Sequence, residues 1–262
     1  MRPDSFAARY GKWAVVAGAS EGLGAAFAAQ LAERGMDLVL VARRGRLLGD
    51  LAVGLRAKYG VEVRPLVADL AHRTFVDALS DAVSGLDVGV VVYNAAHIPV
   101  APFLEVDDEA IERVVNVNVR GPLLVLRALT PAMCDRGRGA VVLMGSLAGL
   151  QGAPRVAAYA ASKAFNIVLA EGLWYELRGQ GVDVSVCCAG AMRTPGYVRS
   201  FDRNVPGMLS PDEAARRTLD ALGAGPRLVP GLINRIAAQL VGRVLPRRAA
   251  IRLIARNTTR LS

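Results

Sequence analysis

The fold of this chain is decided by the stretch Trp13-Ala14-Val15-Val16-Ala17-Gly18-Ala19-Ser20-Glu21-Gly22-Leu23-Gly24. Its first five residues are apolar and predict a buried strand, and the residues after it have the composition of a helix. Glycines let the backbone turn tightly and approach a ligand closely. A helix that begins there directs free N–H groups and a favourable dipole at a pyrophosphate. We therefore expect a cofactor-binding loop, with a purely structural glycine turn as the alternative. Its expected ligands are Gly18, Ser20, Gly22, Leu23 and Gly24.

The alternation of short apolar runs and amphipathic segments continues along the chain, which is typical of βα units around a parallel sheet. Strands are predicted at Trp13–Ala17, Asp37–Ala42, Glu62–Val67, Val88–Tyr93, Ala140–Met144, Val182–Cys187 and Arg227–Val229. Helices are predicted near Leu23–Arg34, Arg46–Tyr59, Thr74–Ser84, Glu109–Met133, Ala157–Gly179 and Pro211–Leu222. Pro65 cannot complete the hydrogen bonding of a central strand, so the third strand belongs at an edge. The pattern predicts a doubly wound, Rossmann-like α/β sheet of about seven strands in the order 3-2-1-4-5-6-7, with helices on both faces.

The composition indicates a packed globular protein, since 53% of the 262 residues are hydrophobic. Charged residues interrupt the first twelve positions before the apolar segment of a secretory signal could form. The three cysteines, Cys134, Cys187 and Cys188, do not suit a disulfide framework, so a reducing, cytoplasmic location is expected. A net charge of +9 raises the question of nucleic acid, but the aromatic content of 5% and the lack of an aromatic-basic motif argue against it.

The end of the second predicted strand indicates which nicotinamide cofactor would fit. The sequence there reads Val39-Leu40-Val41-Ala42-Arg43-Arg44, without an acidic residue. An Asp or Glu at this place binds the 2′-hydroxyl of NAD, whereas an Arg accommodates the 2′-phosphate of NADP. We therefore expect NADP(H) rather than NAD(H), with Arg43 as the phosphate ligand.

Tyr159 and Lys163 lie four residues apart within a predicted helix. Positions i and i+4 share a helix face, so the phenol and the ammonium would project side by side. An adjacent cation favours the phenolate, and this interaction would lower the pKa of Tyr159 toward neutrality. Such a tyrosine suits acid-base chemistry at a carbonyl or carbinol. Only three residues of the chain are lysine, which argues against a chance pairing.

Together these features resemble the short-chain dehydrogenase/reductase family over about residues 11–225. The resemblance rests on the glycine loop, Asp69-Leu70, Asn94-Ala95-Ala96, Asn118, Ser146 and the pair Tyr159 and Lys163, in the family's order. Ser146 stands thirteen residues before Tyr159, as the family pattern requires. The resemblance implies an oxidoreductase that transfers hydride between NADP(H) and a carbonyl or hydroxyl carbon.

The resemblance also implies catalytic roles. Tyr159 would protonate the carbonyl oxygen during reduction, and Lys163 would lower its pKa and bind the nicotinamide ribose. Ser146, at the carboxyl end of the fifth strand, would hydrogen-bond the substrate oxygen. Asn118 would hold a water that relays protons to Lys163. Pro122 has no N–H for the Asn118 carbonyl at i−4, which predicts a kink and a free carbonyl; a kink made only for packing is the alternative.

Further cofactor contacts follow from the same resemblance. Asp69 would contact the adenine, Asn94 would anchor the central strand and the cofactor, and Thr194 would bind the nicotinamide carboxamide. Structural capping is the alternative for Asp69 and Asn94. Two positions depart from the family pattern, with Ala96 in place of glycine and Ala189 in place of proline. These departures put cofactor affinity in question but remove no catalytic group.

Substrate loops are expected at His97–Phe103, Leu147–Arg155 and Met192–Leu209 by the same resemblance. Their apolar members are Ile98, Phe103, Leu147, Leu150, Tyr197, Val198, Phe201, Val205 and Met208. This set suits a lipophilic carbonyl, such as a fatty-acyl, terpenoid, steroid-like or polyketide ketone, although core packing is the alternative for many of these residues. His97 is interpreted as a loop residue rather than a catalyst.

The residues Pro226–Ser262 differ from the rest, because they contain eight arginines and no acidic residue. We therefore divide the chain into a Rossmann-fold catalytic domain, 1–225, and a basic amphipathic extension, 226–262. Apolar residues between Leu232 and Leu245 can share one helix face. A basic stripe follows at Arg248, Arg252, Arg256 and Arg260. The extension is interpreted as a lid, a subunit contact, a solvated face or a peripheral membrane-surface element.

Two function classes stay open at this point. One is an NADP(H)-dependent carbonyl reductase or alcohol dehydrogenase, and the other is a non-catalytic NADP(H)-binding or sensing protein on the same scaffold. The complete set of Ser146, Tyr159 and Lys163 favours the enzyme. The resemblance further implies a homodimer or homotetramer. We expect a small hydrophobic substrate, no metal and no nucleic-acid partner.

Overall fold

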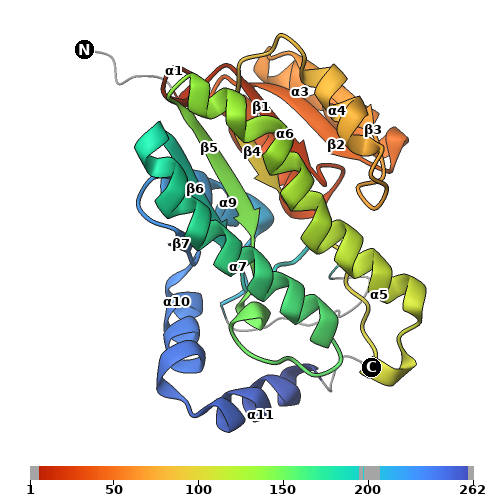
Figure 1. Ribbon diagram of the computed structural model, residues 1–262, viewed down its shortest axis with the longest axis vertical. Coiled ribbons are helices and arrows are strands. Elements are labelled where there is room, and N and C mark those ends of the chain that lie inside the picture. Colours follow the sequence, from red (N-terminus) through yellow and green to blue (C-terminus); the bar gives the residue numbers. More distant parts are fainter. Residues whose placement is uncertain (1–5, 195–196, 198–206, 259–262) are drawn as a thin grey trace.

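The architecture is one parallel sheet covered by helices (Figure 1). The computed structural model describes residues 6–194, 197 and 207–258, and for 256–258 the backbone alone. Within this region, seven strands pair in the order β3-β2-β1-β4-β5-β6-β7. They are β1 (Trp13–Ala17), β2 (Asp37–Ala42), β3 (Val63–Val67), β4 (Val88–Tyr93), β5 (Gly139–Met144), β6 (Val182–Cys187) and β7 (Arg227–Leu228). The predicted strand order is confirmed, and each predicted strand lies within one residue of its expected bounds.

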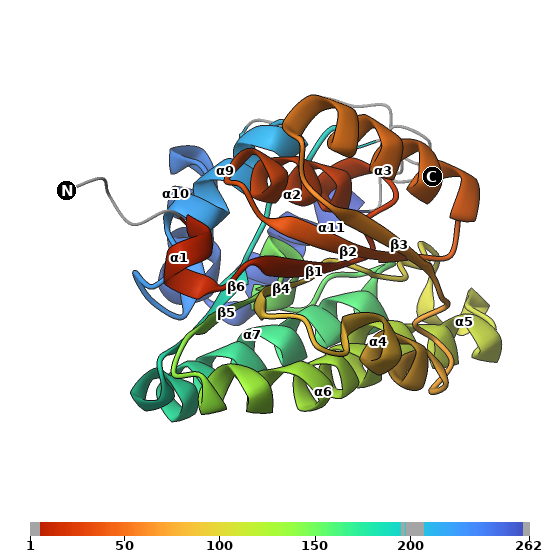
Figure 2. The ribbon, with the colours of Figure 1, turned by 90° about the horizontal axis from the view of Figure 1, so that it is seen from above.

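Helices lie on both faces of the sheet, as Figure 2 shows from above. One face carries α2 (Gly22–Glu33), α3 (Gly45–Tyr59) and α9 (Pro211–Asp220). The other face carries α4 (Phe75–Val83), α6 (Gly121–Asp135) and α7 (Ala157–Leu177). Shorter elements are α1 (Phe6–Tyr10), α5 (Asp108–Val114), the π-helical turn η2 (Val115–Arg120) and the 3-10 turns η1 (Phe103–Glu105), η3 (Leu147–Leu150) and η4 (Arg178–Gln180). The two helical layers shield the central strands from water on both sides.

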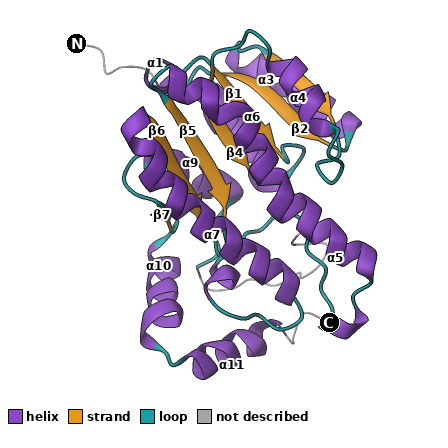
Figure 3. Cartoon of the chain, in the orientation of Figure 1, coloured by secondary structure: helices purple, strands orange, loops and turns teal. Residues whose placement is uncertain are grey.

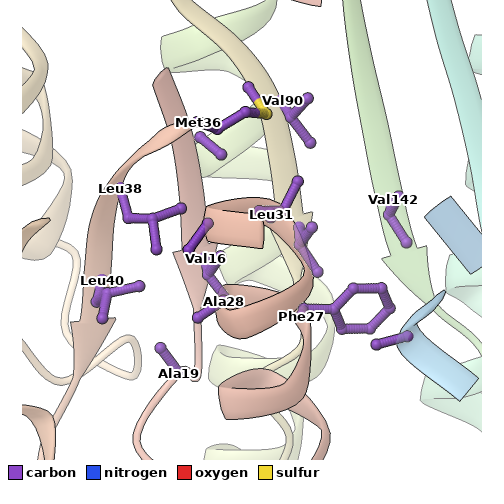
Figure 4. Packing of buried hydrophobic residues seen from close by; sticks show 14 of the residues in the cluster. Val16, Ala19, Phe27, Ala28, Leu31, Met36, Leu38, Leu40, Val90 and Val142 are labelled. Carbon is purple, nitrogen blue, oxygen red and sulfur yellow. The ribbon is translucent and has the colours of Figure 1, made fainter. Parts of the chain in front are cut away.

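The packing of α2 shows how the layers are joined (Figure 4). Phe27 and Leu31 of α2 lie beside Val16 of β1, and all three are fully buried. The neighbouring Val15 points to the opposite face, where it packs under α4, α6 and α7. Both faces of the strand are therefore buried, which explains why the central strands are continuous apolar runs instead of alternating ones.

The edge strand is β3, as Pro65 predicts. In the described sheet β3 pairs with β2 alone, with Pro65 opposite Leu40. Arg64 and Pro65 are both exposed. A proline is tolerated here because its missing N–H falls on a strand with no neighbour on its outer side.

The single long helix predicted in the middle of the chain is interrupted by the π-helical turn η2. Within this turn the Gly121 N–H reaches the Asn116 carbonyl, five residues back. The Tyr93 hydroxyl donates to the Val117 carbonyl at 2.7 Å. Pro122, which has no N–H, lies in the first turn of α6. The helix before Pro122 thus contains a π-turn, a feature that often marks functional sites, and the predicted kink stays a prediction.

The basic extension adds two helices at one end of the molecule. The sheet continues through β7, past the expected domain boundary at residue 225. It is followed by α10 (Leu232–Gln239), the π-helical turn η5 (Leu240–Val244) and α11 (Arg247–Thr258). Figure 3 shows α10 beside β7, and α11 beyond the end toward which β5 points. Among the described residues, no helix is long and apolar enough to cross a membrane.

Candidate active site

A cavity of about 490 Å³ opens at the carboxyl edge of the sheet. Its walls are the segments that follow the strands β1 to β6, together with the first turns of α7. Ligands of open α/β sheets bind at this edge. The predicted site residues that line it are Gly18, Ser20, Gly22, Leu23, Arg43, Asp69, Asn94, Ser146, Tyr159, Lys163 and Thr194. Gly24 and Asn118 lie behind the wall and contact the residues that form it.

The glycine loop is held tightly against the end of β4. Gly18 has a φ of 85°, and an added Cβ would lie 2.6 Å from the Ala95 nitrogen. A Cβ on Gly24 would collide with the Gly18 carbonyl and the Asn94 amide. Asn94 Nδ2 donates to that carbonyl at 3.0 Å. The glycines therefore allow the loop to close on β4, and the N-terminus of α2 stays at the cavity wall, where it can receive an anion.

The two arginines after β2 differ in what they contact. Arg44 donates to the Ser20 hydroxyl at 2.9 Å and pairs with the Glu21 carboxylate at 3.0 Å, so it fastens the glycine loop. Arg43 is exposed and lines the cavity; in the described region of the chain it makes no hydrogen bond or ion pair. A guanidinium in this state can bind a phosphate through two parallel hydrogen bonds. Arg43 therefore remains the candidate ligand of a 2′-phosphate.

Asp69 is tied into the cavity wall by Arg113 of α5, a residue that sequence reasoning missed. Arg113 Nη2 lies 2.6 Å from Asp69 Oδ2, and Asp69 Oδ1 accepts a hydrogen bond from the Ala71 N–H at 3.0 Å. Burial acts to raise the pKa of Asp69, but the hydrogen bonds from Arg113 and Ala71 outweigh it and lower the pKa. Asp69 is thus an ionised, oriented acceptor. Its contact with adenine stays a prediction.

Ser146, Tyr159 and Lys163 meet at one side of the cavity. Ser146 follows β5, and its hydroxyl accepts a hydrogen bond from the Ala148 N–H at 3.2 Å. A hydrogen bond also joins the side chains of Ser146 and Tyr159. The Lys163 ammonium lies 5.6 Å from the centre of the Tyr159 ring and donates to the Met144 carbonyl at 2.8 Å. The helical spacing in α7 therefore brings the phenol and the amine to the same cavity as the serine.

The pKa of Tyr159 does not follow the sequence expectation. Tyr159 is partly exposed along the cavity wall, yet the surrounding protein desolvates the phenol and raises its pKa, against an opposing hydrogen bond with Ser146. Burial lowers the pKa of Lys163 to about 8. The expected lowering of the Tyr159 pKa by an adjacent cation is wrong here, because the amine is itself desolvated and donates to the Met144 carbonyl. A tyrosine that keeps its proton at neutral pH can still act as an acid.

Asn118 is fully buried in η2 and joins two walls of the cavity. Its Oδ1 accepts from the His97 N–H at 2.7 Å, and its Nδ2 donates to the His97 carbonyl at 2.9 Å. The same Nδ2 donates to the Ser162 hydroxyl at 3.0 Å. Asn118 therefore fixes the segment after β4 against α7, beside Lys163. The sequence suggested a role for its carbonyl but not this side-chain clamp.

Three residues of the predicted substrate loops line the cavity, His97, Ile98 and Met192. Burial, together with the charges of Arg113 and Arg43, lowers the pKa of His97, so this histidine is neutral at pH 7. The remaining predicted apolar residues do not line this cavity or fall outside the described residues. Phe103, Leu147, Leu150, Tyr197 and Met208 do not line it. Val198, Phe201 and Val205 lie outside the described residues.

The two positions that depart from the family pattern are both at the cavity wall. Ala96 and Ala189 line it. The Ala189 carbonyl accepts a hydrogen bond from the Leu147 N–H at 3.1 Å, which joins the segments after β6 and β5. Thr194, farther along the segment after β6, accepts a hydrogen bond at its Oγ1 from the Tyr197 N–H at 3.1 Å. Both alanines therefore fit the backbone of the site as it stands.

The C-terminal helix α11 packs on the segment that follows β5. Arg247 donates to the Leu150 carbonyl at 2.8 Å, and Ala250 is fully buried. Ile254 joins a small apolar cluster to which Tyr159 also belongs. The extension thus packs on the segment that follows Ser146, and Ile254 and Tyr159 share the same apolar cluster. The role of the tail stays a prediction.

Comparison with known proteins relates this site to a family. The family model described as short chain dehydrogenase matches residues 12–204. The 7beta-hydroxysteroid dehydrogenase of Clostridium sardiniense is 34% identical over 234 residues, which cover 88% of this chain and 90% of that protein. The very-long-chain 3-oxoacyl-CoA reductase of Scheffersomyces stipitis is 34% identical over 232 residues, 84% of this chain and 66% of that longer protein. The chain thus spans nearly the whole of one relative and about two thirds of the other.

Solved structures of similar proteins point to the same family. A structure from work on 7beta-hydroxysteroid dehydrogenase stereoselectivity has a TM-score of 0.89 and 29% identity, covering 95% of this chain and 99% of that one. A short-chain dehydrogenase from Sphingobium yanoikuyae, solved in complex with NADPH, has a TM-score of 0.78 and 31% identity, covering 84% and 88%. The similarity to the first structure extends into the tail, because 95% of this chain is covered.

Proposed function

This chain belongs to the short chain dehydrogenase family, and on that premise we propose that it is an NADP(H)-dependent reductase of a lipophilic ketone. It is an oxidoreductase that acts on CH–OH or C=O groups. The observation that carries the proposal is the meeting of Ser146, Tyr159 and Lys163 in the same cavity as the glycine loop. A sensing protein would need the loop but not this set, so the non-catalytic alternative is not favoured.

The cavity fits NADP(H), which supplies hydride to the carbonyl carbon when bound. The glycine loop and the N-terminus of α2 would hold its pyrophosphate, because both line the cavity and the N-terminus of a helix offers free N–H groups to an anion. Arg43 would hold the 2′-phosphate, since its guanidinium is not engaged by the described residues. Asp69 and Thr194 would contact the two ends of the cofactor. The Sphingobium relative was solved with NADPH, which supports the choice of cofactor.

The side chains supply the proton chemistry. Tyr159 holds its proton at neutral pH because desolvation raises its pKa, so it is ready to protonate a carbonyl oxygen. Ser146, hydrogen-bonded to Tyr159, would share the same substrate oxygen and stabilise its developing charge. Lys163, with its pKa lowered to about 8, can both hold and release a proton near neutrality. Asn118 would position Lys163, because its hydrogen bond to the neighbouring Ser162 holds α7 in place.

The substrate is proposed to be a bulky lipophilic ketone of the steroid or long fatty-acyl kind. Ile98 and Met192 line the cavity, and Ile254 packs in the cluster that includes Tyr159. One relative is named for a hydroxysteroid and another for a very-long-chain 3-oxoacyl-CoA, and the steroid skeleton and the acyl chain are both large and apolar. A preference for such substrates follows from burial of their hydrocarbon surface.

The proposal is tested by NADPH oxidation over a panel of ketones. The panel holds a steroid ketone, a long-chain 3-oxoacyl thioester and a small hydrophilic ketone, each assayed with the whole chain and with Ser146→Ala. We expect turnover of at least one lipophilic ketone, and a loss of about 100-fold or more in Ser146→Ala. Equal turnover of the hydrophilic ketone would reject the substrate class, and no turnover of any ketone would reject the enzyme.

The oligomeric state is proposed from exposed apolar residues, and the cellular location is proposed from the cysteines. The outer sides of η2, α6 and α7 carry exposed apolar residues, which supports pairing of subunits through these helices in a homodimer or homotetramer. They are Val115, Leu123, Val168 and Tyr175. The three cysteines are free, which supports a cytoplasmic setting. A monomer in sedimentation velocity would contradict the assembly.

The extension 226–262 is proposed to be a functional unit attached to the catalytic domain, 1–225, with peripheral membrane contact as one of its roles. Its lack of acidic residues supports contact with an anionic surface. Deletion from residue 229, which keeps β7, is expected to leave NADPH binding in place and to abolish binding to anionic vesicles. Loss of NADPH binding would contradict this division.

A further inference from the structure

The outward side of α10 and η5 is apolar, which is the reverse of an ordinary surface helix. Five large apolar side chains on this segment are between 44% and 66% exposed. They are Leu232, Ile233, Ile236, Leu240 and Val244, and we call them the outer apolar face. Single exposed apolar residues are common on protein surfaces, but a contiguous group on one short helix marks an interaction site.

A buried polar residue fixes this orientation. Asn234 points inward and is only 6% exposed. Its Nδ2 donates to the Pro230 carbonyl at 2.9 Å and to the Gly207 carbonyl at 3.1 Å. An added Cβ on Gly190 would lie 2.7 Å from its Oδ1, so α10 seats closely on the segment after β6. Turning the outer apolar face inward would move this amide away from its place beside Gly207 and Gly190 and break its hydrogen bond to the Gly207 carbonyl, and therefore the face stays in solvent.

The positive charge around the outer apolar face indicates which kind of partner binds there. All residues that carry charge between Pro226 and Ser262 are arginines, and Arg235 and Arg243 are exposed on the same segment. A second copy of the chain, docked through this face about a two-fold axis, would bring one arginine-rich segment against another. An anionic bilayer offers negative headgroups to the arginines and hydrocarbon to the apolar residues.

We propose that the outer apolar face enters the interfacial layer of an anionic membrane, with the neighbouring arginines on its headgroups. Because α10 contacts η3 and α11 packs on the same segment, the docked face lies beside the substrate side of the cavity. A ketone dissolved in the bilayer would then reach the cavity without crossing water. The membrane contact rests on the surface alone, whereas this route for the substrate rests on the proposed function.

The test is co-sedimentation of the whole chain with vesicles of phosphatidylcholine, with and without about one third phosphatidylserine. We expect binding to the anionic vesicles, weakened by high salt and about tenfold or more weaker on the neutral ones. Leu232→Ser with Ile236→Ser is expected to reduce binding to the anionic vesicles by about tenfold or more. Arg235→Gln with Arg243→Gln is expected to reduce it by a similar factor and to remove much of the salt dependence.

The matched control is Val53→Ser with Leu104→Ser, two exposed apolar residues on other surfaces. This control should bind vesicles as the unchanged chain does, and an equal loss would overturn the proposal. So would failure of the whole chain to bind anionic vesicles, or dissociation of an oligomer by Leu232→Ser with Ile236→Ser, which would identify a second copy as the occupant. NADPH affinity, measured on every variant without vesicles, should be unchanged, because none of these residues lines the cofactor cavity. A failure of catalysis alone would leave the vesicle result standing.

Discussion

At the scale of single residues, Lys163 is a buried ammonium whose charge depends on folding. In the folded protein its pKa is about 8, against an ordinary value of 10.5, because burial penalises the ammonium. Between these pH values the unfolded chain binds a proton that the folded chain lacks. Lys163 therefore destabilises the protein fully below pH 8, and this cost disappears as the pH rises toward 10.5.

This cost gives a pH-dependent prediction for Lys163→Met. Without cofactor, the variant should have the higher free energy of unfolding at about pH 7. The difference should shrink above pH 8 by at most about 1.4 kcal/mol per pH unit, which is the limit for one proton. Urea unfolding of both proteins between about pH 7 and pH 9.5 measures it. A difference that does not change with pH would mean that Lys163 is not desolvated as its contacts indicate.

The two arginines after β2 make a second prediction at this scale. Arg43→Ser should weaken NADPH binding by about 10- to 100-fold and leave NADH binding nearly unchanged, because only the 2′-phosphate contact is lost. Arg44→Ser is the control, since Arg44 holds Ser20 and Glu21 of the glycine loop. Arg44→Ser should weaken the binding of NADPH and of NADH by a similar factor. Fluorescence titration with NADPH and NADH measures both, and equal losses in Arg43→Ser would reject its assignment.

At the scale of elements, the π-turn η2 is the feature that places Asn118. Pro122 withholds an N–H from the helix, and the Tyr93 hydroxyl donates to the Val117 carbonyl within the turn. Asn118 then reaches both His97 and Ser162. A regular α-helix would rotate this side chain away from one or both partners.

Pro122→Ala tests whether the turn serves the site. The new N–H can pair with the Asn118 carbonyl, so we expect equal or greater stability, by up to about 1 kcal/mol, and a turnover number lower by about tenfold. Thermal unfolding and steady-state NADPH oxidation are the measurements, with Asn118→Ala as the reference for complete loss of the clamp. Unchanged turnover in Pro122→Ala would show that Asn118 does not depend on the π-turn.

The strands and helices could be predicted from the sequence, because local patterns determine them. Features that depend on contacts between distant parts of the chain could not be predicted. The strand Val88–Tyr93 follows from its unbroken apolar run, and Pro65 identifies the edge. The pairing of Arg113 with Asp69 joins residues 44 positions apart, with no motif to mark it. The raised pKa of Tyr159 depends on desolvation by the assembled site, which spacing alone cannot reveal.

At the scale of the whole molecule, the candidate active-site cavity and the outer apolar face of α10 and η5 lie at neighbouring positions. The cavity opens at the carboxyl edge of the sheet. Helix α11 packs on the segment after β5, beyond the end of that strand (Figure 1). Periodicity revealed the apolar side of α10 but not its direction, because Asn234 and its two carbonyl partners turn that side outward. The extension is therefore joined to the site through both of its helices.

The central claim is that Tyr159 delivers the proton to the carbonyl oxygen, and Tyr159→Phe tests it most directly. The measurement pairs NADPH titration with single-turnover reduction of a lipophilic ketone at about pH 7. Removal of the hydroxyl leaves the glycine loop and Arg43 in place, so we predict an NADPH dissociation constant within about twofold of the unchanged protein, and a reduction rate lower by about 10²- to 10⁴-fold. A variant that reduces the ketone within about tenfold of the unchanged rate would contradict the account.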